Sequence, residues 1–221
     1  MTPIMKVITE YCDKYINDIR FKKLAKDNAS LYSWRTWAYL RPAISLFDNP
    51  STMYDYLTKD MIEPKFDSYI YQIETEGTQT ITLGEEYKGY ELFDAIQVDE
   101  DGEYYVMENC TYDSENATIT ITDAVEGDIY QFDFYKDGYF AKDLTGEQMN
   151  ILGICFSLIW ELRFSNDFIA MTPKLEDKTF AEQNRANKIL ADNARIREIK
   201  TFLNETMNKY AQNIVIRKIR N

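Results

Sequence analysis

The spacing of apolar side chains changes twice along this chain of 221 residues. Up to about residue 63 apolar residues recur every three or four positions, which is typical of amphipathic helices. Residues 64–143 contain short runs that alternate with a period of two, and helical spacing returns from residue 144. The two periods predict an α+β fold with three parts, residues 1–63, 64–143 and 144–221.

The N-terminal part is predicted to be helical. Pro3 suits a first helical turn, and an apolar stripe follows it at Ile4, Val7, Ile8, Tyr11, Tyr15, Ile19 and Phe21. A second helix is expected over residues 30–47, with a kink or restart at Pro42. After the turn at Asn49, a short helix is expected to contain Met53, Tyr56, Leu57 and Met61.

The middle part is predicted to be an antiparallel β-sandwich or barrel. Its strand-like runs are residues 68–73, 78–83, 95–98, 104–107, 118–122 and 129–135. The runs are short, rich in β-branched and aromatic residues, and separated by turn-forming residues at roughly ten-residue spacing. In residues 129–135, Tyr130, Phe132 and Phe134 are expected on one face of the strand.

The C-terminal part is predicted to contain two helices. Thr145 and Gln148 fit a capping box in front of the apolar run 151–162, which leaves almost no polar face and predicts burial on most sides. A longer helix is expected from about Thr179 to Ala211, roughly 50 Å at 1.5 Å per residue. Its heptad-like apolar positions are Ile189, Ile196, Ile199, Leu203, Met207, Tyr210 and Ile214. We expect the N- and C-terminal parts to form one helical layer, into which the β-unit is inserted.

The charge is distributed unevenly between these parts. The whole chain has 25 basic and 37 acidic residues, a net charge of −12. Residues 60–143 contain 4 basic and 22 acidic residues (−18), whereas residues 1–59 carry +3 and residues 174–221 carry +5. The total charge disfavours binding to nucleic acid and anionic membranes. This uneven distribution of charge instead favours contacts between the acidic middle of one molecule and the basic end of another.

The composition excludes the familiar catalytic classes. The chain has no histidine, which removes His-based acid–base catalysis, Ser-His-Asp systems and nearly all catalytic zinc sites. Cys12, Cys110 and Cys155 show no metal-ligand spacing and are expected to be reduced. The first ten residues do not resemble a signal peptide, and no apolar run is long enough for a membrane span. We therefore expect no enzyme activity, no cofactor, no metal and no membrane partner.

Two acidic patterns suggest sites but fit them poorly. Residues 99–102 resemble the start of a calcium loop, yet the glycine and the final glutamate are misplaced, so a hairpin turn is favoured. Pairs among Glu74, Glu76, Glu85, Glu86 and Asp94 resemble glycosidase carboxylates, but 37 acidic residues make such pairs inevitable.

A candidate subunit interface combines the basic, β-branched tail with tyrosines of the middle part. The tail is expected to follow the long helix without belonging to it, and an isolated chain end of this kind normally frays. Either a partner subunit or the molecule's own domain could hold it in place. The interface candidates are Ile214, Val215, Ile216, Arg217, Ile219, Tyr104 and Tyr130.

Residues 127–197 resemble a class of tailed-bacteriophage virion proteins. The resemblance is carried by Gly-Asp-Ile-Tyr-Gln-Phe-Asp-Phe-Tyr-Lys-Asp-Gly-Tyr-Phe at 127–140, Asp-Leu-Thr-Gly-Glu-Gln at 143–148, the apolar helix 151–162, Lys174-Leu175, Phe180 and the segment 184–187. Together with the long helix that follows, the resemblance covers about the final 95 residues of the chain. Proteins of this class belong to the phage neck, the head–tail connector and the tail-completion components.

The resemblance implies a non-catalytic subunit of a homo-oligomeric ring, assembled in the host cytoplasm and located in the virion. Its partners would be copies of itself and neighbouring portal or tail proteins. DNA would pass without sequence-specific binding, and the acidic β-unit would suit either the outer surface or a channel wall. The alternative is a carbohydrate- or receptor-binding β-module, because 17 tyrosines could form a binding face. Equally, tyrosine suits strands and fills cores.

Overall fold

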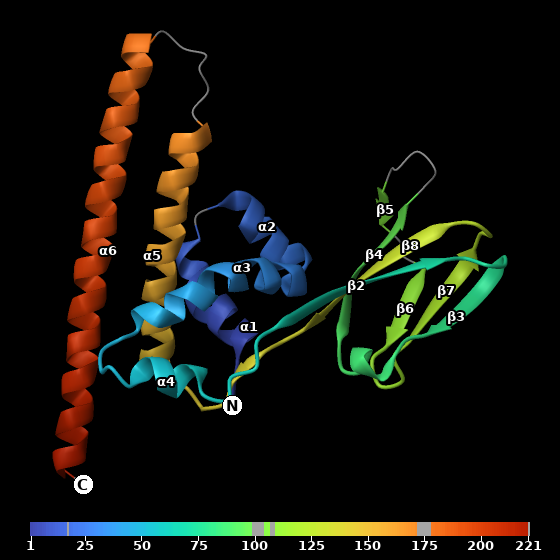
Figure 1. The fold of residues 1–221 in the computed structure, drawn as a ribbon, viewed down its shortest axis with the longest axis horizontal. Helices are drawn as coiled ribbons and strands as arrows, with labels where there is room; N and C mark the ends of the chain where they lie inside the picture. Colours follow the sequence, from blue (N-terminus) through green and yellow to red (C-terminus); the bar gives the residue numbers. More distant parts are fainter. Residues whose placement is uncertain (17, 99–103, 107–108, 172–177, 221) are drawn as a thin grey trace. The chain divides into compact units, whose positions relative to one another are not determined.

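The chain folds into two compact units in the computed structural model (Figure 1). The structure describes residues 1–16, 18–98, 104–106, 109–171 and 178–220. Their side chains are described except at 98, 104–106, 164–171, 178–188 and 218–220. The helical unit comprises residues 1–23, 35–62 and 139–221, and the β-unit comprises residues 24–34 and 63–138. The predicted α+β fold is confirmed.

The helical unit joins both ends of the sequence in one core. Its elements are β1 (Thr2–Pro3), α1 (Ile4–Val7), the π-helical turn η1 (Ile8–Cys12), the 3-10 turns η2 (Asp13–Tyr15) and η3 (Ile44–Leu46), α4 (Met53–Thr58), β9 (Tyr139–Phe140), α5 (Gly146–Met171) and α6 (Lys178–Arg220). The division between the two units falls inside α2 (Ile19–Asp27) and α3 (Ala29–Ala43). The two-residue pairing of β1 with β9 was not predicted.

The predicted first helix is interrupted. Residues 4–15 form α1, η1 and η2 in succession, and Ile16 is extended before α2 begins at Ile19. Ile4, Val7 and Ile8 are buried as predicted, whereas Ile19 is exposed. The break at Ile16 resets the helical phase, so the apolar stripe does not continue into α2. The predicted helix over residues 30–47 is found as α3 followed by η3, with Pro42 near the end of α3.

Helix α5 is buried along most of its described length, as its apolar sequence predicts. Its capping box is present: the Gln148 backbone N–H donates to Thr145 Oγ1 (3.2 Å), and the Thr145 N–H donates to Gln148 Oε1 (2.8 Å). The helix packs closely against η1, because a Cβ on Gly153 would lie 2.9 Å from the Tyr11 carbonyl oxygen. Glycine is required there for the close approach of the two backbones.

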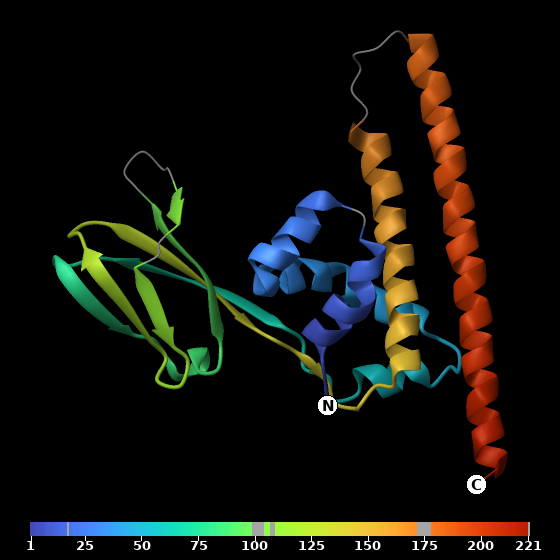
Figure 2. The same ribbon diagram turned by 180° about the vertical axis from the view of Figure 1, so that it is seen from behind.

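Helices α5 and α6 run antiparallel, side by side (Figures 1 and 2). Arg195 of α6 pairs with Glu161 of α5 (Nη2 to Oε1, 2.7 Å). The heptad-like face of α6 lies inward, with buried side chains at Ile196, Leu203, Met207 and Tyr210. The predicted end at Ala211 is wrong, since α6 continues to Arg220. Ile214 keeps the heptad spacing, and no glycine or proline follows to end the helix.

The β-unit contains two antiparallel sheets. Their strands are β2 (Lys65–Gln72), β3 (Gly77–Thr82), β4 (Glu91–Val98), β5 (Tyr104–Val106), β6 (Cys110–Asp113), β7 (Thr118–Ala124) and β8 (Ile129–Lys136). The strand orders are β2-β8-β4-β5 and β3-β7-β6. The predicted β4–β5 hairpin pairing is found, while its turn at 99–103 lies outside the described residues.

The core of the β-unit lies between the two sheets. Side chains from both sheets contribute to it, including Ile81 and Ile119 from one and Phe132 and Phe134 from the other. Among the described strands the sheets remain separate, so the arrangement is a sandwich and no closed barrel is found. The face predicted for Tyr130, Phe132 and Phe134 is confirmed, because all three belong to this core. Asp133 and Tyr135, on the opposite face of β8, are also buried.

Candidate subunit interface

The C-terminal end of α6 extends beyond the helix on which it packs. Tyr210 is level with Gln148, and Asn213 Nδ2 is 3.5 Å from Glu147 Oε1, in the first turn of α5. Residues 214–220 therefore continue past the start of α5 for about 10 Å, at 1.5 Å per residue. We call this segment the α6 end. Five of the seven interface candidates predicted from the sequence lie on it.

The α6 end presents apolar and basic side chains to solvent. Val215 is 55% exposed and Ile216 is 47% exposed. Ile214 is half-buried, and Arg217 is exposed. The side chain of Ile219 lies outside the described residues. The segment was predicted to be a tail separate from the helix, but its helical form places Ile214 on the same face as the buried Tyr210 and Met207.

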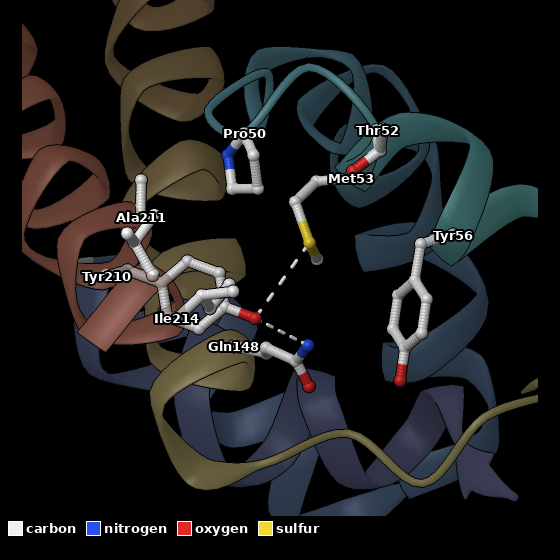
Figure 3. A pocket seen from close by; sticks show the side chains of 9 residues that line it. Pro50, Thr52, Met53, Tyr56, Gln148, Tyr210, Ala211 and Ile214 are labelled. Carbon is white, nitrogen blue, oxygen red and sulfur yellow. Dashed lines mark hydrogen bonds between the residues drawn. The ribbon is translucent and has the colours of Figure 1, made fainter. Parts of the chain in front are cut away.

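A pocket of about 470 Å³ lies at the base of the α6 end (Figure 3). Three helices supply its main side chains: Met53 and Tyr56 from α4, Gln148 from α5, and Tyr210, Ile214 and Val215 from α6. Most of these groups are apolar, and Val215 is shared between the pocket and the exposed surface. The pocket and the α6 end therefore form one continuous surface that suits apolar side chains.

The polar groups on the floor of the pocket bond to one another (Figure 3). Gln148 Nε2 donates to Tyr210 Oη (2.8 Å), and Tyr210 Oη lies 3.9 Å from Met53 Sδ. The other end of the amide, Oε1, already accepts from the Thr145 N–H. Burial raises the pKa of Tyr210, so its hydroxyl stays protonated at neutral pH. These groups fix the pocket's shape and contain no acid–base pair suited to catalysis near pH 7.

The sequence did not identify the pocket. Gln148 was assigned only as the cap of α5, and Tyr210 only as a heptad position. The sequence contained a partial indication of the pocket, because a capping-box glutamine uses its side-chain oxygen in the cap and leaves its amide nitrogen free to donate to another group. Its partner Tyr210 lies 62 positions away, and no local pattern indicates that contact.

The two tyrosines predicted for the interface lie in the β-unit. Tyr130 is 1% exposed, and its ring stacks on Phe132 with centroids 6.1 Å apart. It belongs to the core, and assigning it to a surface was incorrect. It occupies the inner face of β8, which the second sheet covers. Tyr104 pairs with Val98 in the strand register, while its side chain lies outside the described residues.

Other tyrosines of the β-unit are partly exposed. Tyr69 and Tyr71 stack with centroids 6.5 Å apart, and Tyr87 contacts Tyr69 edge-on at 6.2 Å. Burial, and then the nearby Asp67 carboxylate, raise the pKa of Tyr87 to about 12. We call Tyr69, Tyr71 and Tyr87 the tyrosine cluster.

The acidic patterns considered from the sequence do not assemble into a metal site in the described part of the chain, where no group of three or more candidate ligands is found. The calcium-like residues 99–102 lie outside the described residues. Asp94 lies opposite Asp133 in the strand register. Burial, and then Asp133, raise the pKa of Asp94. Among the described helices, none is both long and apolar enough to cross a membrane.

Comparison with protein-family models and with curated proteins finds no match for this chain. The resemblance to phage neck proteins therefore stays a prediction from the sequence.

Proposed function

We propose that the protein is a non-catalytic structural subunit that assembles with copies of itself into a ring, as a neck or head–tail connector component of a tailed-phage virion. The observation that carries the proposal is the α6 end, a helix segment that leaves apolar side chains beside an open pocket. The resemblance of residues 127–197 supports the assignment to a virion. It also supports assembly in the host cytoplasm and contacts with portal or tail proteins.

The energetics favour a protein partner at the α6 end. Fully burying a valine or isoleucine side chain contributes about 1.5–3 kcal/mol. Val215 and Ile216 are each about half exposed, so covering both would add about 2 kcal/mol in total. A buried cluster of this kind at the centre of an interface can dominate its affinity. A ring follows when one surface binds a different surface of the next copy and the rotation closes.

Sedimentation velocity of the purified chain tests the assembly. We expect a concentration-dependent species larger than the 26.1 kDa monomer, and its loss in Val215→Asp. The matched control is Leu190→Asp, which changes an exposed apolar residue of the same helix, about 38 Å away at 1.5 Å per residue. Full assembly of Val215→Asp, or equal loss in both variants, would contradict the proposed site.

Mass spectrometry of purified phage particles tests the virion assignment. We expect peptides of this chain in particles banded on a density gradient, at several copies for each portal ring. Absence of the chain from intact particles would refute the assignment, whatever its oligomeric state in solution.

A second candidate function is carbohydrate or receptor binding by the β-unit, favoured by the partly exposed tyrosine cluster. Aromatic rings beside a carboxylate such as Asp67 combine an apolar contact face with a hydrogen-bond acceptor. Glycan-array binding by the full chain, lost in Tyr71→Ala, would support this function. An array without binding would exclude it for the glycans tested.

A further inference from the structure

Among the described residues, a helical segment covers the outer face of the four-stranded sheet at one end. Residues 24–34 belong to the β-unit and lie against this end. Trp34 stacks on Phe66 of β2 with centroids 5.2 Å apart, and Ser30 Oγ donates to Glu91 Oε2 of β4 (3.0 Å). At this end of the sheet, therefore, a helical segment packs against the outer face.

At the other end of the same face, apolar side chains are exposed on either side of the half-buried Gln131. Side chains two apart on a strand share a face, so Ile70 lies on the same side as Phe66. In the strand register Ile70 and Ile96 both pair with Gln131, and Ile129 lies two residues before Gln131 on β8. Ile70 is 66% exposed, Ile129 is 39% exposed, and Ile96 is half-buried. We call the surface formed by Ile70, Ile96 and Ile129 the open half.

Acidic residues lie at one edge of the open half. The loops after β2 and before β8 meet there, since the Ile73 N–H donates to the Asp128 carbonyl (2.9 Å). These loops carry Glu74, Glu76 and Glu126, all exposed. Between residues 66 and 135 the sequence has 18 acidic residues and one basic residue, Lys88. A partner of this surface should therefore be apolar in its centre and positively charged beside it.

The α6 end has these properties. Val215 and Ile216 supply exposed apolar side chains, and Lys209 and Arg217 are exposed beside them. Residues 206–221 contain four basic residues and no acidic residue. The segment is also helical, which matches the kind of element that already covers the other end of the sheet face.

We propose that the α6 end of one copy packs across the open half of the β-unit of the next copy. The inference rests on the proposed function and names the two surfaces that join in the ring. Each copy then uses two different surfaces, the α6 end and the open half, so the contact is head-to-tail. Such a contact propagates from copy to copy until the ring closes.

Mixing two interface variants tests this inference. Val215→Asp removes the apolar contact of the α6 end, and Ile70→Lys disrupts the open half. Each variant alone should sediment as a monomer, because one of its two surfaces is defective. An equimolar mixture should form a dimer, since the intact open half of the first variant binds the intact α6 end of the second. The dimer cannot grow further, because the two surfaces left at its ends are the defective ones.

Two controls make the outcomes decisive. Far-UV circular dichroism shows that each variant is folded, with Ile216→Asp and Ile129→Lys as replacements for a variant that is not. Ile19→Asp changes an exposed apolar residue outside both surfaces and should assemble like the wild type. A mixture that stays monomeric, or a single variant that still assembles, would overturn the head-to-tail contact while the wild-type oligomer stands. A wild type that is monomeric at every concentration would instead refute the proposed function.

Discussion

The hydrogen bond between Gln148 and Tyr210 should stabilise the base of the α6 end by about 1 kcal/mol. Both side chains are 6% exposed, and the bond length is 2.8 Å. A neutral hydrogen bond contributes about 0.5–1.5 kcal/mol net, and a buried donor left without a partner costs about 1–3 kcal/mol. Because the pocket admits water, we expect Tyr210→Phe to lower the free energy of unfolding by about 1 kcal/mol.

A double-mutant cycle separates this bond from the capping of α5. Gln148→Ala removes both the bond to Tyr210 and the acceptor for the Thr145 N–H, so we expect a loss of about 2 kcal/mol. In that background Tyr210→Phe should have almost no further effect, which gives a coupling energy of about 1 kcal/mol. Urea unfolding followed by circular dichroism at 222 nm measures each variant through its helices.

The control is a second cycle that pairs Thr145→Ala with Tyr210→Phe. The Thr145 hydroxyl bonds only the Gln148 backbone N–H among its described contacts, so the two changes should be nearly additive. A Gln148–Tyr210 coupling energy below about 0.3 kcal/mol, the usual error of additivity, would refute the claim that the cap of α5 and the α6 end are joined through this amide.

Three further predictions concern other parts of the fold. Gly153→Ala should destabilise the protein by about 1–3 kcal/mol in urea unfolding, although alanine favours helices, because its Cβ meets the Tyr11 backbone; unchanged or higher stability would contradict that packing. Of the three thiols, Cys110 alone is only half-buried, so it alone should react with Ellman's reagent before denaturation; rapid reaction of all three would contradict the structure. The pKa of Asp94 is raised by burial and Asp133, so the stability contributed by its protonated form is lost as pH rises through that pKa. Asp94→Asn should therefore have a higher free energy of unfolding than the wild type at pH 7, and this difference should disappear below about pH 4. A difference that grows as the pH is lowered would contradict the predicted direction.

The regular elements followed from apolar spacing because the long elements bury their apolar positions along the part of their length whose side chains are described. The strands with strict alternation and the heptad face of α6 were predicted for this reason. Local spacing could not reveal the break at Ile16, since an extended residue inside an apolar stripe leaves the stripe unchanged in the sequence. The pairing of Thr2 with Phe140 joins positions too far apart for any local pattern.

The candidate site was predictable in part. Composition identified Val215, Ile216 and Arg217, because apolar and basic residues gather there without acidic ones. Two other features depended on tertiary structure. The pocket exists only because α4, α5 and α6 meet at Tyr210. The alternation of apolar and polar residues in β8 showed which side chains share a face with Tyr130. It did not show that this face is buried, because the burial depends on the second sheet, which packs against it.

Chemical cross-linking between isotopically distinct copies tests the head-to-tail assembly most directly. Unlabelled and ¹⁵N-labelled protein are mixed, and a carbodiimide joins lysine amines to carboxylates that touch them. The account predicts peptides pairing a light Lys209 with a heavy Glu74, Glu76 or Glu126, and the reverse combination. Cross-links of Lys209 that occur only within one isotope class, or none to the β-unit of another copy, would contradict it.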